Sequence, residues 1–167
     1  MNRRNLMGSL AGLAVAGAMP FAVATDALAA PATIDRAKLP ALMGGDFATA
    51  TSQLAARRAS SRAVKAFAEL EIAEQAAVAK AFGSRPGAAG VSRRQAAMIE
   101  ELRGLSGPAF DVMYVEGQIM GHKELLKIHQ AYARTGRDPQ ARGASMVGVT
   151  GIQSHLFLLN SIRSQLA

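Results

Sequence analysis

The chain has 167 residues, of which 50% are hydrophobic but only 5% aromatic, and it carries a formal net charge of +7. This length suits a single domain, and the alanine-rich, aromatic-poor composition favours closely packed helices over sheets. The sequence contains no cysteine, which excludes thiolate catalysis, thiolate metal ligands and a lipid-modified N-terminal cysteine.

The first 29 residues have the pattern of a cleavable export signal. Arg3 and Arg4 precede an apolar stretch rich in alanine and glycine, which covers residues 6–23. Residues 27–29, Ala-Leu-Ala, then have the small-x-small pattern of a signal cleavage site. We therefore expect residues 1–29 to be a signal peptide and the mature protein to lie in the periplasm or another extracytoplasmic compartment.

The paired arginines indicate the export route. Arg3-Arg4 followed by Asn-Leu-Met is similar to the twin-arginine export motif, and the weakly hydrophobic stretch behind it fits the same pathway. The general secretory route is the alternative, so the expected partners in transit are the twin-arginine or the general export machinery. A retained N-terminal anchor is less favoured, because alanine and glycine gain little on entering a bilayer.

A linker and a short helix are predicted after the signal peptide. Residues 30–45 contain two prolines and a Gly-Gly pair, which is typical of a linker. Asp46 is a suitable N-cap for a first helix that ends near Ala59. These boundaries predict a helical domain over residues 46–167.

Capping and turn signals divide the rest of the chain into four more helices. Ser92 and Gln95 have the spacing of a capping box, and Pro108 and Pro139 suit first helical turns. The predicted helices cover residues 62–82, 92–105, 108–135 and 139 to near 167. No segment shows the alternation of a strand, so the pattern predicts an all-α, up-down bundle preceded by a signal peptide.

Polar side chains interrupt the apolar faces of the three long helices. On a helical wheel, Glu71 lies in the middle of one apolar face with Glu74 at its edge, and His155 lies within the face of the last helix. Asp111 and His122 lie along the flank of the longest helix. Because a buried charge is costly unless it is paired or bound to a metal, these residues predict either mutual hydrogen bonds or a divalent cation such as iron, zinc or manganese.

The spacing of these residues fits a bundle metal site only in part. Di-iron bundles use Glu-x-x-His pairs, whereas Glu71 is followed three residues later by Glu74. The first predicted helix contains no glutamate. His129 is expected to be partly exposed near the end of the bundle. A polar core that holds no metal is therefore the competing interpretation.

The remaining features favour a protein without catalytic activity. Basic residues are scattered near helix ends, with no aromatic residues between them for base stacking, so no nucleic-acid partner is expected. No nucleophile–base, zinc-protease or phosphate-loop motif is present. The leading hypothesis is a non-catalytic envelope or stress-related protein. The alternatives are a metal-binding or redox bundle and a basic protein with weak contact to an anionic envelope surface.

The second half of the chain carries the clearest family resemblance. Residues 105–111, Leu-Ser-Gly-Pro-Ala-Phe-Asp, are followed by Tyr114, Gln118, His122 and His155, and residues 54–61 and 64–68 add a weaker match. Together these segments resemble an exported, ferritin-like family of unknown function, whose members are often described as periplasmic or outer-membrane proteins.

The resemblance implies a ferritin-like four-helix bundle over residues 46–160 and no established activity. Two departures bear on a metal site. Members of the family commonly carry Asp-His where this chain has Glu74 and Gln75, and they carry glutamate where this chain has Ala50. The missing ligands favour the polar core over the metal site.

Overall fold

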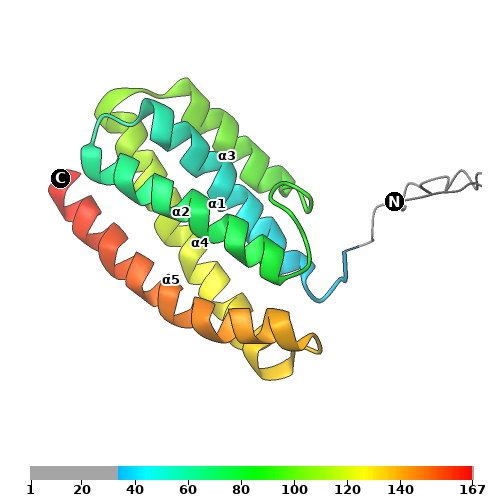
Figure 1. Cartoon of the computed structure of the whole chain (residues 1–167). Coiled ribbons are helices and arrows are strands. Elements are labelled where there is room, and N and C mark those ends of the chain that lie inside the picture. Colours follow the sequence, from blue (N-terminus) through cyan, green and yellow to red (C-terminus); the bar gives the residue numbers. More distant parts are fainter. Residues whose placement is uncertain (1–33, 167) are drawn as a thin grey trace, which may run out of the picture. The chain divides into compact units, whose positions relative to one another are not determined.

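The structure, a computed structural model, describes residues 34–166 and consists there of five α-helices without any strand (Figure 1). The helices are α1 (Leu39–Arg58), α2 (Arg62–Ala81), α3 (Arg93–Gly104), α4 (Gly107–Thr135) and α5 (Pro139–Leu166). The all-α prediction is confirmed for these residues. The predicted signal peptide, residues 1–29, lies outside them.

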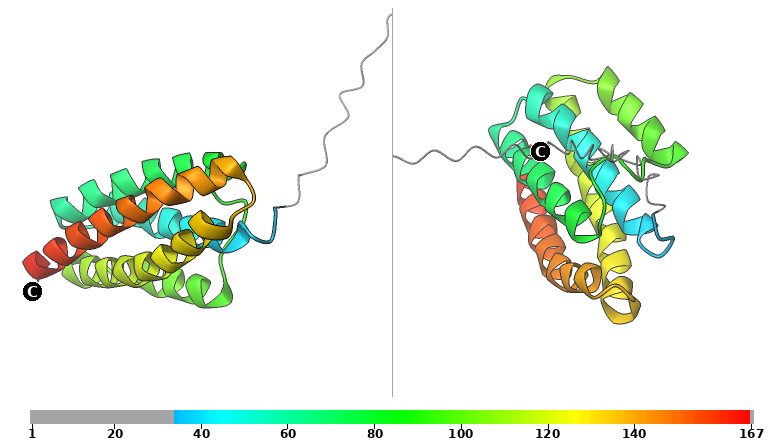
Figure 2. Two further views of the ribbon diagram at one scale, coloured as in Figure 1. Left: turned by 90° about the horizontal axis from the view of Figure 1, so that it is seen from below. Right: turned by 45° about the vertical axis from the view of Figure 1, so that its right-hand side comes forward.

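Four of the helices form a closed ring of neighbours. Helix α1 packs against α2 and α4, and α5 packs against the same two helices. Helix α3 lies against α1 and α4 (Figures 1 and 2). This arrangement turns one face of α2, α4 and α5 toward a common interior, where their polar residues can meet.

The first helix begins at Leu39 and not at Asp46, so the predicted linker is wrong for residues 39–45. A proline in the first turn is compatible with this start, because its missing N–H has no intrahelical partner there. The two glycines serve close packing. A Cβ atom on Gly44 would lie 2.5 Å from Leu125 Cδ2, and one on Gly45 would lie 2.6 Å from Gln75 Oε1.

Asp46 is therefore a residue of the helix body, and its side chain holds a loop. The buried carboxylate accepts hydrogen bonds from the backbone N–H groups of Gly87, Ala89 and Gly90 at 2.6, 2.9 and 2.9 Å. Gly87 and Gly90 have φ values of 83° and 71°, which favour glycine. The loop between α2 and α3 is thus tied to α1.

The other helix boundaries follow the capping signals of the sequence. Ser92 Oγ accepts from Gln95 N at 3.2 Å, and Gln95 Oε1 accepts from Ser92 N at 2.8 Å, which confirms the predicted capping box. Ser61 is the N-cap of α2. These ends differ from the predicted ones by at most one residue, which is within the usual variation of helix termini.

The interior consists of two apolar clusters with a polar layer between them. One cluster includes Phe67, Tyr114 and Leu159, and the other includes Phe82 and Tyr132. Buried polar residues lie between the two clusters on three helices: Glu71 and Gln75 on α2, His122 on α4 and His155 on α5. The polar layer therefore lies near the middle of the four packed helices, measured along their length.

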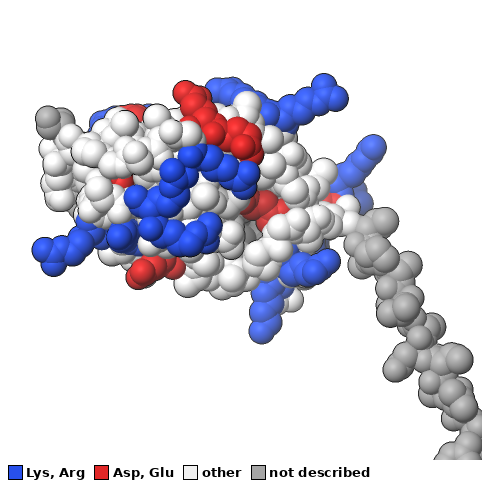
Figure 3. Space-filling model, turned by 90° about the horizontal axis from the view of Figure 1, so that it is seen from above, with Lys and Arg blue, Asp and Glu red and all other residues white. Residues whose placement is uncertain are grey.

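The surface carries mixed charges. On the face shown in Figure 3, Lys and Arg side chains lie at several separate places and acidic side chains lie among them. Across residues 34–166, no helix combines the length and the apolar character needed to cross a membrane.

Candidate metal centre

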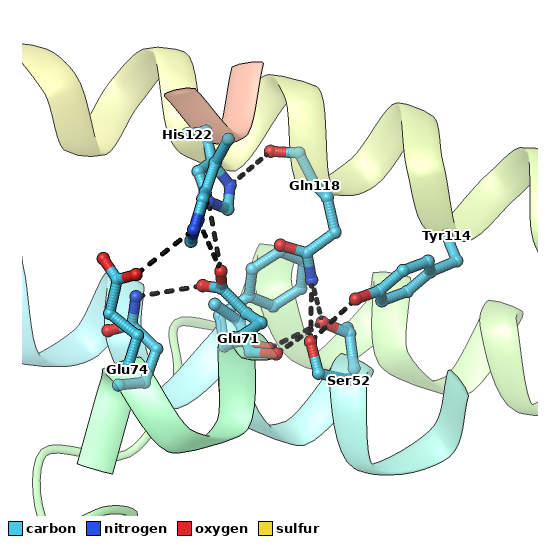
Figure 4. A network of polar contacts seen from close by, with 11 residues as sticks. Ser52, Glu71, Glu74, Tyr114, Gln118 and His122 are labelled. Atoms are coloured by element: carbon cyan, nitrogen blue, oxygen red, sulfur yellow. Dashed lines mark hydrogen bonds and ion pairs between the residues drawn. The ribbon is translucent and has the colours of Figure 1, made fainter. Parts of the chain in front are cut away.

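Three buried side chains from three different helices converge in the polar layer (Figure 4). Glu71 comes from α2, His122 from α4 and His155 from α5, and their exposed fractions are 0%, 1% and 8%. The ring of neighbours brings them together because each faces the interior, which the helical wheel predicted for Glu71 and His155, whereas it placed His122 on the flank of its helix.

One atom of each side chain forms a compact triangle. Glu71 Oε2 lies 3.0 Å from His155 Nδ1 and 3.3 Å from His122 Nε2, and the two nitrogens lie 3.2 Å apart. Glu71 Oε2 nevertheless has no hydrogen bond of acceptable geometry within the described residues. A buried carboxylate oxygen is thus directed at two imidazole nitrogens without a regular hydrogen-bond partner.

Each imidazole ring has an oxygen atom close to its other nitrogen. His122 Nδ1 lies 2.9 Å from the carbonyl oxygen of Gln118, and His155 Nε2 lies 3.2 Å from Glu74 Oε2. Both acceptors are oxygens, so each of these nitrogens carries the proton and donates. In neutral rings, the lone pairs of His122 Nε2 and His155 Nδ1 are then left free to bind a cation.

Further contacts fix the carboxylate and close the site on one side. Gln75 Nε2 donates to Glu71 Oε1 at 2.9 Å, which leaves Oε2 to face the imidazoles. The ring of Phe67 lies 5.2 Å from the His155 ring and 6.0 Å from the His122 ring, measured between centroids. This apolar wall limits the access of water to the triangle.

The electrostatics favour a charged pair when no metal is bound. Burial alone would raise the pKa of Glu71, but its contacts with His122 and His155 outweigh burial and lower the pKa to about 2. Contacts with Glu71 and Glu74 raise the pKa of His155 to about 10. Near neutral pH, the metal-free site therefore holds a Glu71 carboxylate and a His155 imidazolium.

Of the five residues that the sequence suggested as ligands, Asp111 does not join the cluster. Its carboxylate accepts hydrogen bonds from Ser60 N at 3.0 Å and from Ser61 N at 2.8 Å, and also bonds the Ser60 hydroxyl. Asp111 precedes His122 by eleven residues, or about 16 Å along an α-helix, which separates it from the triangle. Its contacts instead fix the turn between α1 and α2.

His129 is buried, with an exposed fraction of 4%, so the expectation of partial exposure is wrong. Its Nδ1 lies 3.1 Å from Ser145 Oγ. Gly148 makes room for the ring, because a Cβ atom at that position would lie 3.4 Å from the same nitrogen. Burial lowers the pKa of His129, which favours a neutral ring outside the cluster.

Helix α1 also contributes to the polar layer, through two small hydroxyl residues. Ser52 Oγ lies 2.8 Å from the Tyr114 hydroxyl, and Gln118 Nε2 donates to Thr51 Oγ1 at 2.8 Å (Figure 4). Gln118 also provides the carbonyl oxygen that orients His122.

Comparison with known proteins assigns the family but no activity. Residues 21–161 match the family described as "Domain of unknown function (DUF4142)". No curated protein and no solved structure shows significant similarity to the chain. Because the match spans most of the sequence, the chain belongs to the DUF4142 family.

Proposed function

We propose that this protein binds one divalent transition-metal ion through Glu71, His122 and His155. The observation that carries the proposal is the triangle of donor atoms with edges of 3.0, 3.2 and 3.3 Å. Ligand atoms with bonds of about 2.0 Å lie about 3.3 Å apart on a tetrahedral ion and about 2.9 Å apart on an octahedral one. The observed edges fall within this range, so an ion can bind all three atoms with little movement.

The donor set restricts the kind of ion. Two imidazoles and one carboxylate suit zinc, iron and manganese, whereas magnesium and calcium prefer sites made of oxygen atoms alone. Three protein ligands also leave at least one coordination position for water or a small ligand. Glu71 Oε2, which has no hydrogen-bond partner within the described residues, supports metal binding, because a cation would supply that partner.

A structural polar core is the second candidate, and the pKa values favour it in the absence of a metal. The imidazolium of His155 can donate to both Glu71 and Glu74, whose contacts raise its pKa to about 10. In this case a proton takes the place of the metal ion, and the cluster serves only to fix α2, α4 and α5 relative to one another.

The wider account of the protein is also a proposal. The ring of α1, α2, α4 and α5 supports a ferritin-like four-helix bundle with α3 as an addition. The sequence pattern of residues 1–29 supports export to the periplasm, by the twin-arginine route, and a role in the envelope or in stress response. Ferroxidase or oxygenase activity does not follow, since a fold does not determine a function.

Metal content and metal-dependent stability test the proposal. The full chain, produced in a bacterium and purified without an affinity tag, is analysed for metals and melted before and after treatment with chelator. We expect near-stoichiometric zinc, iron or manganese and a melting temperature that chelator lowers. His122→Gln should abolish both effects, and His129→Gln, a buried histidine outside the cluster, should preserve them. Absence of metal together with an unchanged melt would support the structural core instead.

A further inference from the structure

The outer face of α5 is uncharged and exposes four large apolar side chains. Met146, Val147, Phe157 and Leu158 have exposed fractions of 62%, 74%, 76% and 42%. Between Arg142 and Arg163 the helix contains no Lys, Arg, Asp or Glu. Four large apolar side chains exposed on one uncharged helix face mark a candidate interaction site.

The exposed residues of this face form a palindrome about Ile152, which is buried. In chain order they are Gly143, Met146, Val147 and Thr150 before the centre, and Ser154, Phe157, Leu158 and Ser161 after it. The sizes on both sides therefore read small, large, large, small. We call these eight residues the α5 stripe.

A palindromic stripe on a helix is complementary to a second copy of itself. When two such helices pack antiparallel about a twofold axis at the level of the central residue, positions equally far before and after the centre meet. Val147 then faces Phe157 of the second copy, and Met146 faces Leu158. Thr150 faces Ser154 close to the axis, where small side chains allow two helices to approach within the usual 8–10 Å or so.

We infer that the protein forms a symmetric dimer through antiparallel contact of the two α5 stripes. The charge pattern favours a second copy as the occupant, because pairing two uncharged stripes buries no unpaired charge. Helix α5 has α2 and α4 as neighbours within the described residues, and Figures 1 and 2 show no helix of that region over its outer side.

The charges at the rim of this contact predict its salt dependence. In this pairing, Arg142 of one copy and Arg163 of the other would stand at the same end of the stripe, with Arg163 directed at Glu116 on α4, 3.6 Å away. Salt screens such exposed charges. Added salt should therefore strengthen the dimer slightly, whereas it would weaken docking of a basic protein on an anionic surface.

The size of the contact predicts a modest affinity. The stripe covers eighteen residue steps, or about 27 Å of helix. Two helices in contact over this length bury on the order of 1,000 Å² in total, which is near the lower limit for a specific interface. The expected dimer is thus in concentration-dependent equilibrium with the monomer, in the micromolar range. This inference is independent of the metal proposal.

Sedimentation velocity on the full chain over a range of concentrations tests the dimer. We expect a monomer–dimer equilibrium that Val147→Glu or Phe157→Glu weakens at least tenfold, with circular dichroism spectra and melts that show an intact fold. The matched control is Val112→Glu on α4, a valine with an exposed fraction of 44% that lies outside the stripe. It should leave the equilibrium unchanged.

The antiparallel pairing makes a sharper prediction. In the double variant Val147→Glu/Phe157→Lys, each glutamate faces a lysine of the second copy, so the double variant should dimerise more strongly than either single variant. A protein that stays monomeric at all concentrations would overturn the inference. So would a dimer that the stripe variants leave unchanged, or binding of the stripe to anionic phosphatidylglycerol vesicles by the monomer.

Discussion

His122 Nε2 and His155 Nδ1 lie 3.2 Å apart although the two histidines are 33 residues apart in the chain and belong to different helices. The other nitrogen of each ring lies close to an oxygen atom: His122 Nδ1 to the Gln118 carbonyl oxygen, and His155 Nε2 to Glu74 Oε2. Both rings are thus held with one nitrogen directed at Glu71. This relationship underlies the predictions for the site.

Removing the carboxylate that orients His155 should weaken metal binding without abolishing it. Glu74→Gln replaces the charged acceptor of the His155 Nε2 proton by a neutral one. Changes to such an outer partner typically reduce metal affinity about 10- to 100-fold. The measurement is a zinc titration by calorimetry on the full chain. Glu69→Gln, at an exposed position of α2, is the matched control and should not change the affinity.

The metal-free protein should lose stability as the pH rises above neutrality. The pKa of His155 is raised from 6.5 to about 10 in the folded state. A raised pKa stabilises the folded state fully below the unfolded value, and this contribution is lost as the pH rises through the folded value. Melting temperatures of chelator-treated protein should therefore fall between pH 6.5 and pH 10.

The variant His155→Gln separates the effect of the His155 charge on stability from the titration of other groups. Glu71, Glu74 and His122 face His155, and only loss of the His155 proton removes the charge that pairs with both carboxylates. His155→Gln should show a smaller fall over the same pH range. Identical pH profiles for the two proteins would mean that the ion pair does not stabilise the fold.

Asp111 should contribute to the stability of the fold and not to metal binding. Asp111→Ala leaves the N–H groups of Ser60 and Ser61 without their acceptor at the partly buried turn between α1 and α2. Hydrogen bonds to a charged group contribute about 1.5–3 kcal/mol, so we expect a loss of about 2–4 kcal/mol in unfolding free energy. Urea unfolding measures it, with Asp35→Ala at an exposed position as control. A drop in zinc affinity that is larger for Asp111→Ala than for the control would place Asp111 in the site after all.

The close contact at Gly44 predicts an unusual response to alanine. Alanine normally stabilises a helix relative to glycine by up to about 1 kcal/mol. At Gly44 the added Cβ would lie 2.5 Å from Leu125, and such overpacking costs about 1–3 kcal/mol. Gly44→Ala should therefore destabilise the protein.

Gly117 on α4 is the control for this effect. A Cβ atom there would meet Met98 Cε at 3.7 Å, which is an ordinary contact, so Gly117→Ala should stabilise the protein. Thermal melts of the two variants give the comparison. If both substitutions stabilise the protein, α1 and α4 are not packed as closely as the structure describes.

The sequence predicted most of the helices, and it suggested Glu71, Glu74, His122 and His155, with Asp111, as converging residues, because both depend on local patterns. A helix cap depends on a few neighbouring residues, as at Ser92 and Gln95. The inward direction of Glu71 and His155 follows from helical periodicity alone, whereas His122 was expected on the flank of its helix. These features need no knowledge of which helix packs against which.

The errors arose where tertiary packing decides. The Gly44-Gly45 pair is equally typical of a linker and of a helix that packs closely, and only the position of Leu125 and Gln75 distinguishes the two. Asp111 lies on the same face as His122, yet the turn at Ser60 provides its partners. Periodicity gives the direction of a side chain but not what stands opposite it.

The most direct test of the metal proposal is a crystal structure of the full chain grown with zinc, with diffraction data collected on both sides of the zinc absorption edge. The proposal predicts one strong anomalous peak about 2.0–2.2 Å from Glu71 Oε2, His122 Nε2 and His155 Nδ1. A triangle with the same edges and no anomalous peak, or zinc bound only elsewhere, would contradict it and leave the cluster as a proton-bridged structural core.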